Sequence, residues 1–285
     1  MNRMWIAPIA AVAVIVVLLM STAVGLGQGA SNGPANAVTA APNVVSGSVG
    51  SSVSAGTCGQ SHIPLGAASA FRILAGTTIT NTGNTVVKGS IGVSPGSSVT
   101  GFPPGKVTGA IDKADTAAAN AEKALTTAYN NGMGRSNCAV SVAGNIGGKT
   151  LTPGLYHSSS SLSISSGDLT LNANGHSNGV FIFQTVSKFT MTSGRHVILA
   201  GGAQAANIYW VVGSSATLGS TAVIFGNILA HKSISLATGA ILHGRALARI
   251  GGVTMQDNRI VFDEPMSPTT LSHSDSSPLV ARTYS

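Results

Sequence analysis

The chain has 285 residues and a formal net charge of +7, and 44% of its residues are hydrophobic. That hydrophobic content suffices for a folded core and excludes a wholly disordered chain. Only 8% of the residues are charged and 5% are aromatic, while 36 are glycine, which favours short, turn-rich strands and predicts a mainly β fold. The 15 basic residues are scattered singly along the sequence, so nucleic acid is not expected as a partner.

The N-terminal segment predicts export. Residues 5–20 form an apolar run that follows Arg3 and leads into small residues, as in a secretory signal peptide. Because the run is nearly long enough to span a bilayer, an uncleaved membrane anchor is the alternative. We therefore expect residues 1–25 to be a signal peptide or an anchor, and the protein to be secreted or extracytoplasmic, attached to the membrane through residues 5–20 in the second case.

Segments of low complexity flank the central region. Residues 26–60 are rich in Ser, Gly and Val, show no amphipathic period, and are predicted to be a flexible linker. Residues 264–285 are rich in Ser and Pro and lack hydrophobic periodicity, which predicts a disordered C-terminal tail. The folded domain is therefore expected over residues 61–263.

The chain contains two cysteines, Cys58 and Cys138. An even pair in a chain expected to be exported favours one disulfide, which would tie the N-terminal lead of the domain to the segment after its helix. The alternative is a pair of unpaired, half-buried thiols, because the sequence does not show whether the two Cα atoms come close enough for a bond.

One helix is predicted, over residues 110–131, because apolar residues recur there at helical spacing. Its apolar face is predicted to consist of Ala114, Ala117, Ala118, Ala121, Leu125 and Ala128. A face so rich in alanine can lie close against a flat sheet. The Asn-Asn-Gly stretch at residues 130–132 is predicted to end the helix.

The remainder of the domain after the helix is predicted to form short strands, each bounded by Gly, Asn or Ser. They cover residues 155–165, 168–173, 179–185, 188–193, 196–202, 207–213, 215–220, 222–227, 228–237, 240–248 and 252–258. Phe189, Ala216, Ile234 and Val253 are taken as equivalent inward positions, separated by 27, 18 and 19 residues. These steps are near the length of one coil of a three-sided β-solenoid, and their imperfect period predicts an irregular three-faced β-helix.

One strand of each coil is predicted to contribute to a common flat face. Because side chains alternate along a strand, the middle residue of each strand points outward, and stacking aligns these residues into a ladder. The ladder is predicted to contain Ser163, Thr190, Thr217, Ser235 and Thr254, with Thr78 and Thr80 as candidates from an N-terminal coil and with Thr192, Ser215 and Ser233 beside it. Any single Ser or Thr is explained as well by an ordinary outward strand position, so the prediction depends on the whole ladder.

Long strings within the domain carry a family resemblance. They are LGAASAFRILAGTTIT, VKGSIGVSPGSSVTGFPPGKVTG, TLTPGLY, GVFIFQ, GGAQAANIYWVVGSSATLGSTAVIFGNILA and GRALAR, in a match from about Leu65 to Phe262. Together they resemble the microbial ice-binding protein family of fungi, bacteria and algae. The resemblance implies an irregular right-handed β-helix with one long helix along a side, and an N-terminal coil docked beside the C-terminal coil out of chain order.

The resemblance also implies a function and a site. The flat face away from the helix would adsorb to ice and inhibit ice growth and recrystallisation, and the predicted ladder occupies the matching strands. Many family members have Cys at the positions of His157 and Ala206 in this chain. That family disulfide cannot form here, which leaves Cys58 and Cys138 as the only pair.

The residues available for chemistry argue against an enzyme. β-Helices that cleave polysaccharides need paired carboxylates, and the coils contain only Asp168 and Asp257, near opposite ends. The seven histidines show no metal-ligand spacing. We therefore expect no catalytic residue, metal, cofactor or small-molecule substrate. The family resemblance implies that the partner is the ice crystal surface, and we expect a monomer. The alternative is an adhesin or carbohydrate-binding module that uses the same face, although that face carries no aromatic platform for a sugar.

Overall fold

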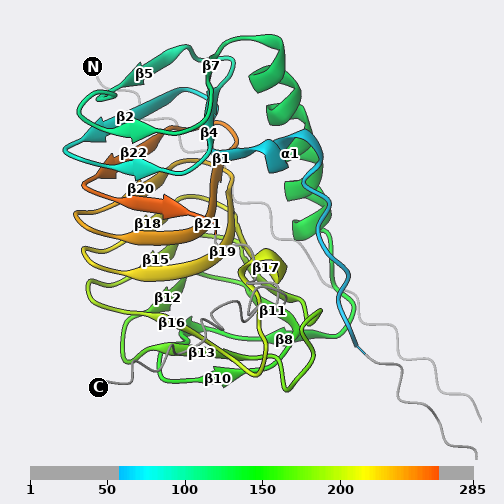
Figure 1. Ribbon diagram of the computed structural model, residues 1–285. Coiled ribbons are helices and arrows are strands. Elements are labelled where there is room, and N and C mark those ends of the chain that lie inside the picture. The colour runs from blue at the N-terminus through cyan, green and yellow to red at the C-terminus, as the bar shows by residue number, and fades with distance from the viewer. Residues whose placement is uncertain (1–57, 263–285) are drawn as a thin grey trace, which may run out of the picture. The chain divides into compact units, whose positions relative to one another are not determined.

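The structure is a computed structural model that describes residues 58–262 (Figure 1). The predicted signal peptide or anchor at residues 1–25 and the predicted tail at residues 264–285 lie outside the described residues, as does nearly all of the predicted linker. Between residues 58 and 262, no helix has the length and apolar character needed to cross a membrane.

Short parallel strands stack into coils and form three sheets, of 12, 8 and 3 strands. The elements before the long helix are η1 (Gly66–Ala70), β1 (Phe71–Ala75), β2 (Thr78–Thr82), β3 (Val86–Val87), β4 (Ser90–Val93), β5 (Ser98–Thr100), β6 (Lys106–Val107) and β7 (Ile111–Lys113). Those after the helix are β8 (Ala139–Ser141), β9 (Gly144–Asn145), β10 (Thr150–Leu151), β11 (Gly154–Ser158), β12 (Leu162–Ile164), β13 (Leu169–Asn172), β14 (Phe181–Thr185), β15 (Phe189–Met191), β16 (Val197–Ala200), η2 (Ala205–Asn207), β17 (Ile208–Val212), β18 (Ala216–Leu218), β19 (Val223–Ala230), β20 (Ile234–Leu236), β21 (Ile241–Ala248), β22 (Val253–Gln256) and β23 (Arg259–Val261).

The predicted inward positions are in register. Phe189 pairs with Ala216, Ala216 with Ile234, and Ile234 with Val253, and all four side chains are buried. The step of 27 residues occurs where the coil carries an additional strand, β16, in the three-stranded sheet. The structure therefore confirms an irregular β-solenoid with three faces.

The order of the coils differs from the order of the chain. Strand β2 pairs with β22, and β1 pairs with β21, so the N-terminal coils lie on the C-terminal coil (Figure 1). This arrangement gives the backbone groups of β22 a partner and leaves β5 at that edge of the 8-stranded sheet, with β9 at the other. It confirms the docking that the family resemblance implied.

The helix α1 spans Thr116–Met133, so both predicted ends were wrong. Residues 111–113 form β7 and pair with β4, and Ala114 adopts a φ of 49° before Asp115 begins the helix. The Asp115 carboxylate accepts a hydrogen bond from the Ala118 N–H at 2.8 Å and is the N-cap. Tertiary strand pairing thus outweighs the local helical propensity of residues 110–115.

The buried face of α1 also differs from the predicted face at both ends of the helix. Ala118, Ala121, Leu125 and Ala128 are buried as predicted, whereas Ala114 and Ala117 are exposed. Instead, Tyr129 and Gly132 complete the buried face, because the helix continues past residues 130–132. A Cβ on Gly132 would stand 2.9 Å from both Ile63 Cδ1 and Val211 Cγ2, so this glycine allows the close approach of the helix end.

α1 connects β7 to β8 and runs alongside the stack of coils (Figure 1). It packs on the outer face of the 12-stranded sheet, against a cluster that includes Leu74, Leu155, Ile182, Leu229 and Leu247. One face of the solenoid is therefore covered by the helix, while the 8-stranded sheet lies on another side.

The interior is filled by side chains stacked between coils. Phe183 lies between Tyr156 and Trp210, with ring centroids 5.2 and 4.2 Å apart and nearly parallel planes. Phe189 stacks on the same indole at 4.8 Å. The Trp210 Nε1 donates a hydrogen bond to the Phe225 carbonyl at 2.9 Å, so its polar atom is satisfied within the core. This packing makes the coils rigid.

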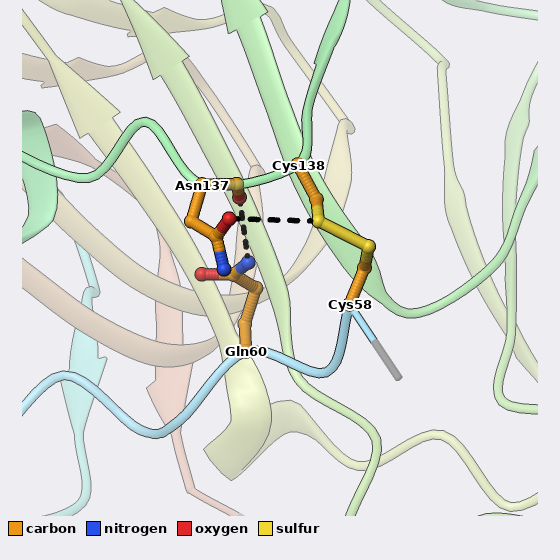
Figure 2. Close-up of a disulfide and its surroundings, with 4 residues drawn as sticks. All are labelled: Cys58, Gln60, Asn137 and Cys138. Atoms are coloured by element: carbon orange, nitrogen blue, oxygen red, sulfur yellow. Dashed lines mark hydrogen bonds between the residues drawn. A yellow bond between two sulfur atoms is a disulfide. The ribbon is translucent and has the colours of Figure 1, made fainter. Parts of the chain in front are cut away.

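A disulfide joins Cys58 to Cys138, and their Cα atoms are 5.8 Å apart (Figure 2). The bonded pair excludes the alternative of two free thiols. Close to it, Gln60 donates a hydrogen bond to the Asn137 carbonyl, and the Arg135 guanidinium donates to the carbonyls of Ser61 and His62. The lead into the domain is therefore fastened to the C-terminal end of α1.

Glu122 lies on α1 beside Arg249 of the corner after β21. Burial raises the pKa of Glu122 from 4.5 to about 8, against a smaller lowering by Arg249, and its buried Oε1 has no hydrogen-bond partner among the described residues. The folded protein therefore retains a proton that the unfolded chain releases above pH 4.5. The free energy of unfolding should fall as the pH rises through this window and become constant above about pH 8.

We expect the variant Glu122→Gln to lose this pH dependence. At pH 9 it should be more stable than the wild type by about 2 to 3 kcal/mol, less than the full pKa shift implies because the carboxyl group is partly accessible. Denaturant unfolding of both proteins at pH 5, 7 and 9 measures the difference. Equal slopes with pH in the two proteins would show that Glu122 does not carry the proton.

Candidate functional site

The outward face of the 8-stranded sheet is called the hydroxyl face below. Its strand order is β5-β2-β22-β20-β18-β15-β12-β9. On each of its central strands two buried residues flank one outward residue, as Phe189 and Met191 flank Thr190 and as Ala216 and Leu218 flank Thr217. The buried pair fixes which side of the strand faces the core, so the outward residue is determined by the same alternation.

The outward residues form a central column in direct register from coil to coil. From β5 to β9 it consists of Thr100, Thr80, Thr254, Ser235, Thr217, Thr190, Ser163 and Asn145. Seven of these eight side chains carry a hydroxyl group. The structure thus confirms the predicted register of the ladder and the place of Thr80 within it, and it adds Thr100 and Asn145, which the sequence analysis missed.

Two further columns lie on either side of the central column. The residues that precede each strand's inward pair form the leading column, which consists of Ser98, Thr78, Gly252, Ser233, Ser215, Lys188 and Ser161. The residues that follow form the trailing column, which consists of Thr82, Gln256, Ala237, Gly219, Thr192 and Ser165. Ser215, Ser233 and Thr192 therefore lie beside the ladder as predicted.

Thr78 was predicted as a ladder residue and lies instead in the leading column. Thr78 lies two residues before Thr80 on β2 and pairs with Ser98 on β5. On its other side, a Cβ added to Gly252 would stand 2.7 Å from the Thr78 Oγ1. Ser98 and Thr82 were missed altogether. They belong to N-terminal coils whose docking on β22 could not be placed by the spacing of the later coils.

The hydroxyl groups differ in how they are held. Thr254 donates to Ser235 Oγ at 3.1 Å, and Ser165 donates to Asn145 Oδ1 at 3.0 Å, so both ends of these pairs are oriented. Between residues 58 and 262, the side chains of Thr80, Thr190 and Thr217 form no hydrogen bond and stand toward the surface. The central column therefore contains hydroxyl groups available to an external partner.

The face is nearly uncharged but not uniformly flat. Lys188 is the only charged residue in the three columns. A shallow hollow of about 340 Å³ lies over Ser235 and Ala237, between Thr217 on one side and Thr254 and Gln256 on the other. Ala237, which has a small side chain, is one of the residues that line it.

The acidic residues that the sequence offered for catalysis have structural partners. Asp168 accepts a hydrogen bond from the His196 N–H, which is the main cause that lowers its pKa, and lies 3.8 Å from Arg195. Asp257 accepts a bond from the Asn84 N–H at 2.6 Å. The two belong to coils four rungs apart, or about 19 Å at the usual strand spacing, too far for an acid–base pair.

Three histidines in the coils each contact a different residue. His196 lies 3.5 Å from Asp168, His231 lies 3.1 Å from the Arg249 guanidinium, and the His243 ring stacks on Phe225. Burial beside Arg249 lowers the pKa of His231. Across residues 58–262, no three His, Cys, Asp or Glu side chains are grouped so that they could hold a metal ion.

A rigid solenoid that presents an ordered, nearly uncharged array of hydroxyl groups belongs to the class of proteins that adsorb to an extended surface. The model of the Ice-binding-like family matches residues 73–261. The chain therefore belongs to the Ice-binding-like family.

Individual relatives agree with this assignment. The chain is 43% identical to an ice-binding protein of Nostoc sp. (strain HG1) over 217 residues, which cover 75% of this chain and 80% of the relative. It is 39% identical to an ice-binding protein of Flavobacterium frigoris (strain PS1), with 71% and 77% covered. The crystal structure of an ice-binding protein from an Antarctic biological consortium superimposes with a TM-score of 0.71 at 49% identity, with 72% and 92% covered.

Proposed function

We propose that this protein adsorbs to ice through the hydroxyl face and thereby inhibits ice growth and recrystallisation. The observation that carries the proposal is the central column, in which seven of eight in-register side chains bear a hydroxyl group. The relatives described above, which are named for ice binding, support the same assignment.

The physical basis is a rigid array rather than a reactive group. Adjacent rungs lie about 4.8 Å apart, so the hydroxyl and methyl groups of the three columns form a two-dimensional lattice that can order a layer of water. Each contact is weak, but a pre-formed plane avoids the conformational entropy that a flexible surface loses on binding. Adsorption of this kind needs no catalytic residue, metal or cofactor, and we propose that the protein is not an enzyme.

We further propose that the protein acts outside the cytoplasm as a monomer. The apolar run of residues 5–20 after Arg3 and the disulfide between Cys58 and Cys138 support export. A retained anchor would place the same face at the cell surface, whereas cleavage would release it.

The test is the behaviour of the full chain in freezing solution. We expect it to shape single ice crystals, to inhibit recrystallisation at micromolar concentration or below, and to be enriched in a slowly grown ice hemisphere relative to a non-binding protein of similar mass. Exclusion from the ice together with unshaped crystals would contradict the proposal. Specific hits on a glycan array in that case would favour the carbohydrate-binding alternative.

A further inference from the structure

A cluster of basic side chains lies on a face of the solenoid other than the hydroxyl face. Strands β6, β3 and β23 are adjacent in the 12-stranded sheet, and Lys106 pairs with Val86, which pairs in turn with Arg259. Val87 and Ile260 are fully buried, so these three neighbouring side chains point away from the core. Lys88 follows two residues after Val86 and points the same way.

Lys88, Lys106 and Arg259 are called the basic triangle here. Lys106 and Arg259 are two rungs apart, or about 10 Å, and Lys88 is about 7 Å along the strand from the rung between them. All three are exposed. The two salt bridges found within residues 58–262 both involve Asp168, so none of the three cations is neutralised by an acidic side chain of the described region.

Other charged residues of the described region lie near the triangle. Asp257, two residues from Arg259, is an acidic neighbour, and its carboxylate accepts a hydrogen bond from the Asn84 N–H. Arg72 on β1 donates a hydrogen bond to the Lys88 carbonyl at 3.2 Å. The guanidinium groups of Arg72 and of Arg245 on β21 both lie over the Phe262 ring. Both arginines are cations beside the triangle. By contrast, the hydroxyl face contains one lysine in its three columns.

We propose that the basic triangle binds an anionic polysaccharide that carries carboxylate groups along its chain. Three cations spaced along a sheet match a polymer whose charges repeat. The column of Lys88 continues through Val261, which is buried, to His243 and Phe225, whose rings stack on each other and are partly exposed.

An anionic membrane fits this surface less well. Membrane-binding surfaces combine basic side chains with large apolar side chains that enter the headgroup region. The side chain at the centre of the triangle is Val86, and it is only partly exposed. The rungs nearest the triangle thus offer spaced charges without an exposed large apolar side chain, which suits an extended polymer.

The arrangement would allow two partners at once. The triangle and the hydroxyl face belong to different sheets, β6-β3-β23 and β5-β2-β22, so an occupied triangle leaves the hydroxyl columns uncovered. A protein held by acidic extracellular polymer could then present its free face to growing ice. The polysaccharide binding itself does not depend on ice activity.

The test compares two variants of the full chain with equal net charge. The patch variant carries Lys88→Gln, Lys106→Gln and Arg259→Gln, and the control carries Lys123→Gln, Lys149→Gln and Lys232→Gln, which are exposed positions elsewhere. Binding to polyuronate beads and to neutral dextran beads is measured at 50 to 300 mM salt. We expect the wild type and control to bind polyuronate, with the patch variant about tenfold weaker, and none to bind dextran.

Each other outcome would overturn the proposal. Equal weakening of the two variants would show that net charge alone drives retention. Absence of wild-type retention on polyuronate, together with binding to vesicles that contain 30% phosphatidylglycerol, would reassign the triangle to a membrane. Thermal unfolding of all three proteins checks that the substitutions leave the fold intact. Ice shaping is scored separately, so failure of the proposed ice function is distinguishable from failure of this one.

Discussion

The double variant Thr190→Tyr and Thr217→Tyr is expected to lose ice activity by at least about tenfold, the equivalent of about 1.4 kcal/mol of adsorption energy. The two residues are adjacent rungs at the middle of the central column. A tyrosine ring at either position would stand above the plane and hold the neighbouring hydroxyl groups away from a flat crystal surface. The loss should therefore exceed that expected from two missing hydroxyl groups. Recrystallisation endpoints and crystal shaping measure it.

A matched control separates the face from the chemistry of the substitution. Thr127 on α1 and Thr150 on β10 are exposed threonines away from the hydroxyl face, so Thr127→Tyr with Thr150→Tyr introduces the same two rings. We expect this control to retain wild-type activity and both variants to unfold near the wild-type temperature. Loss of activity in the control, with an active Thr190/Thr217 variant, would assign ice binding to another face.

Removal of the disulfide by Cys58→Ser with Cys138→Ser is expected to lower the free energy of unfolding by about 2 to 4 kcal/mol. The bond spans 80 residues of sequence, which include the N-terminal coils and α1, and loss of so long a closed loop increases the entropy of the unfolded chain. The hydrogen bonds of Gln60 to Asn137 and of Arg135 to Ser61 and His62 would then hold the lead without the covalent bond. Denaturant unfolding measures the change.

The same experiment contains its own control. A reductant should destabilise the wild type to the level of the serine variant and leave that variant unchanged. Ice activity near 0 °C should survive in both, because β8, which follows Cys138, pairs with β11 in the 12-stranded sheet and contributes no residue to the hydroxyl face. If the serine variant were as stable as the oxidised wild type, the Arg135 contacts rather than the disulfide would fasten the lead.

The sequence alone determined most of the coils after the helix. Phe189, Ala216, Ile234 and Val253 recur inside each coil, and the strict alternation of buried and outward residues along a strand places Thr190 and its equivalents outside. These are local rules of period two combined with a repeat, so they can be read without knowing which coil lies beside which.

The tertiary structure decided what depends on contacts between distant segments. The helix begins at Thr116, after the Asp115 N-cap, because residues 111–113 pair with β4 as strand β7 and do not extend the helix. Thr78 and Thr80 could not be told apart by sequence, since their columns are set by the pairing of β2 with β22, about 170 residues away.

The two surfaces proposed for binding also depend on pairing between strands that are distant in the sequence. Thr100 joins the ladder only through β5, and Lys88, Lys106 and Arg259, which are scattered in the sequence, become neighbours only when β6, β3 and β23 pair. Alternation along a strand determines which side of the strand a residue occupies. The neighbours of that residue across the face are determined by parallel pairing between coils, and docking of the N-terminal coils on the C-terminal coil is a long-range choice that no local pattern encodes.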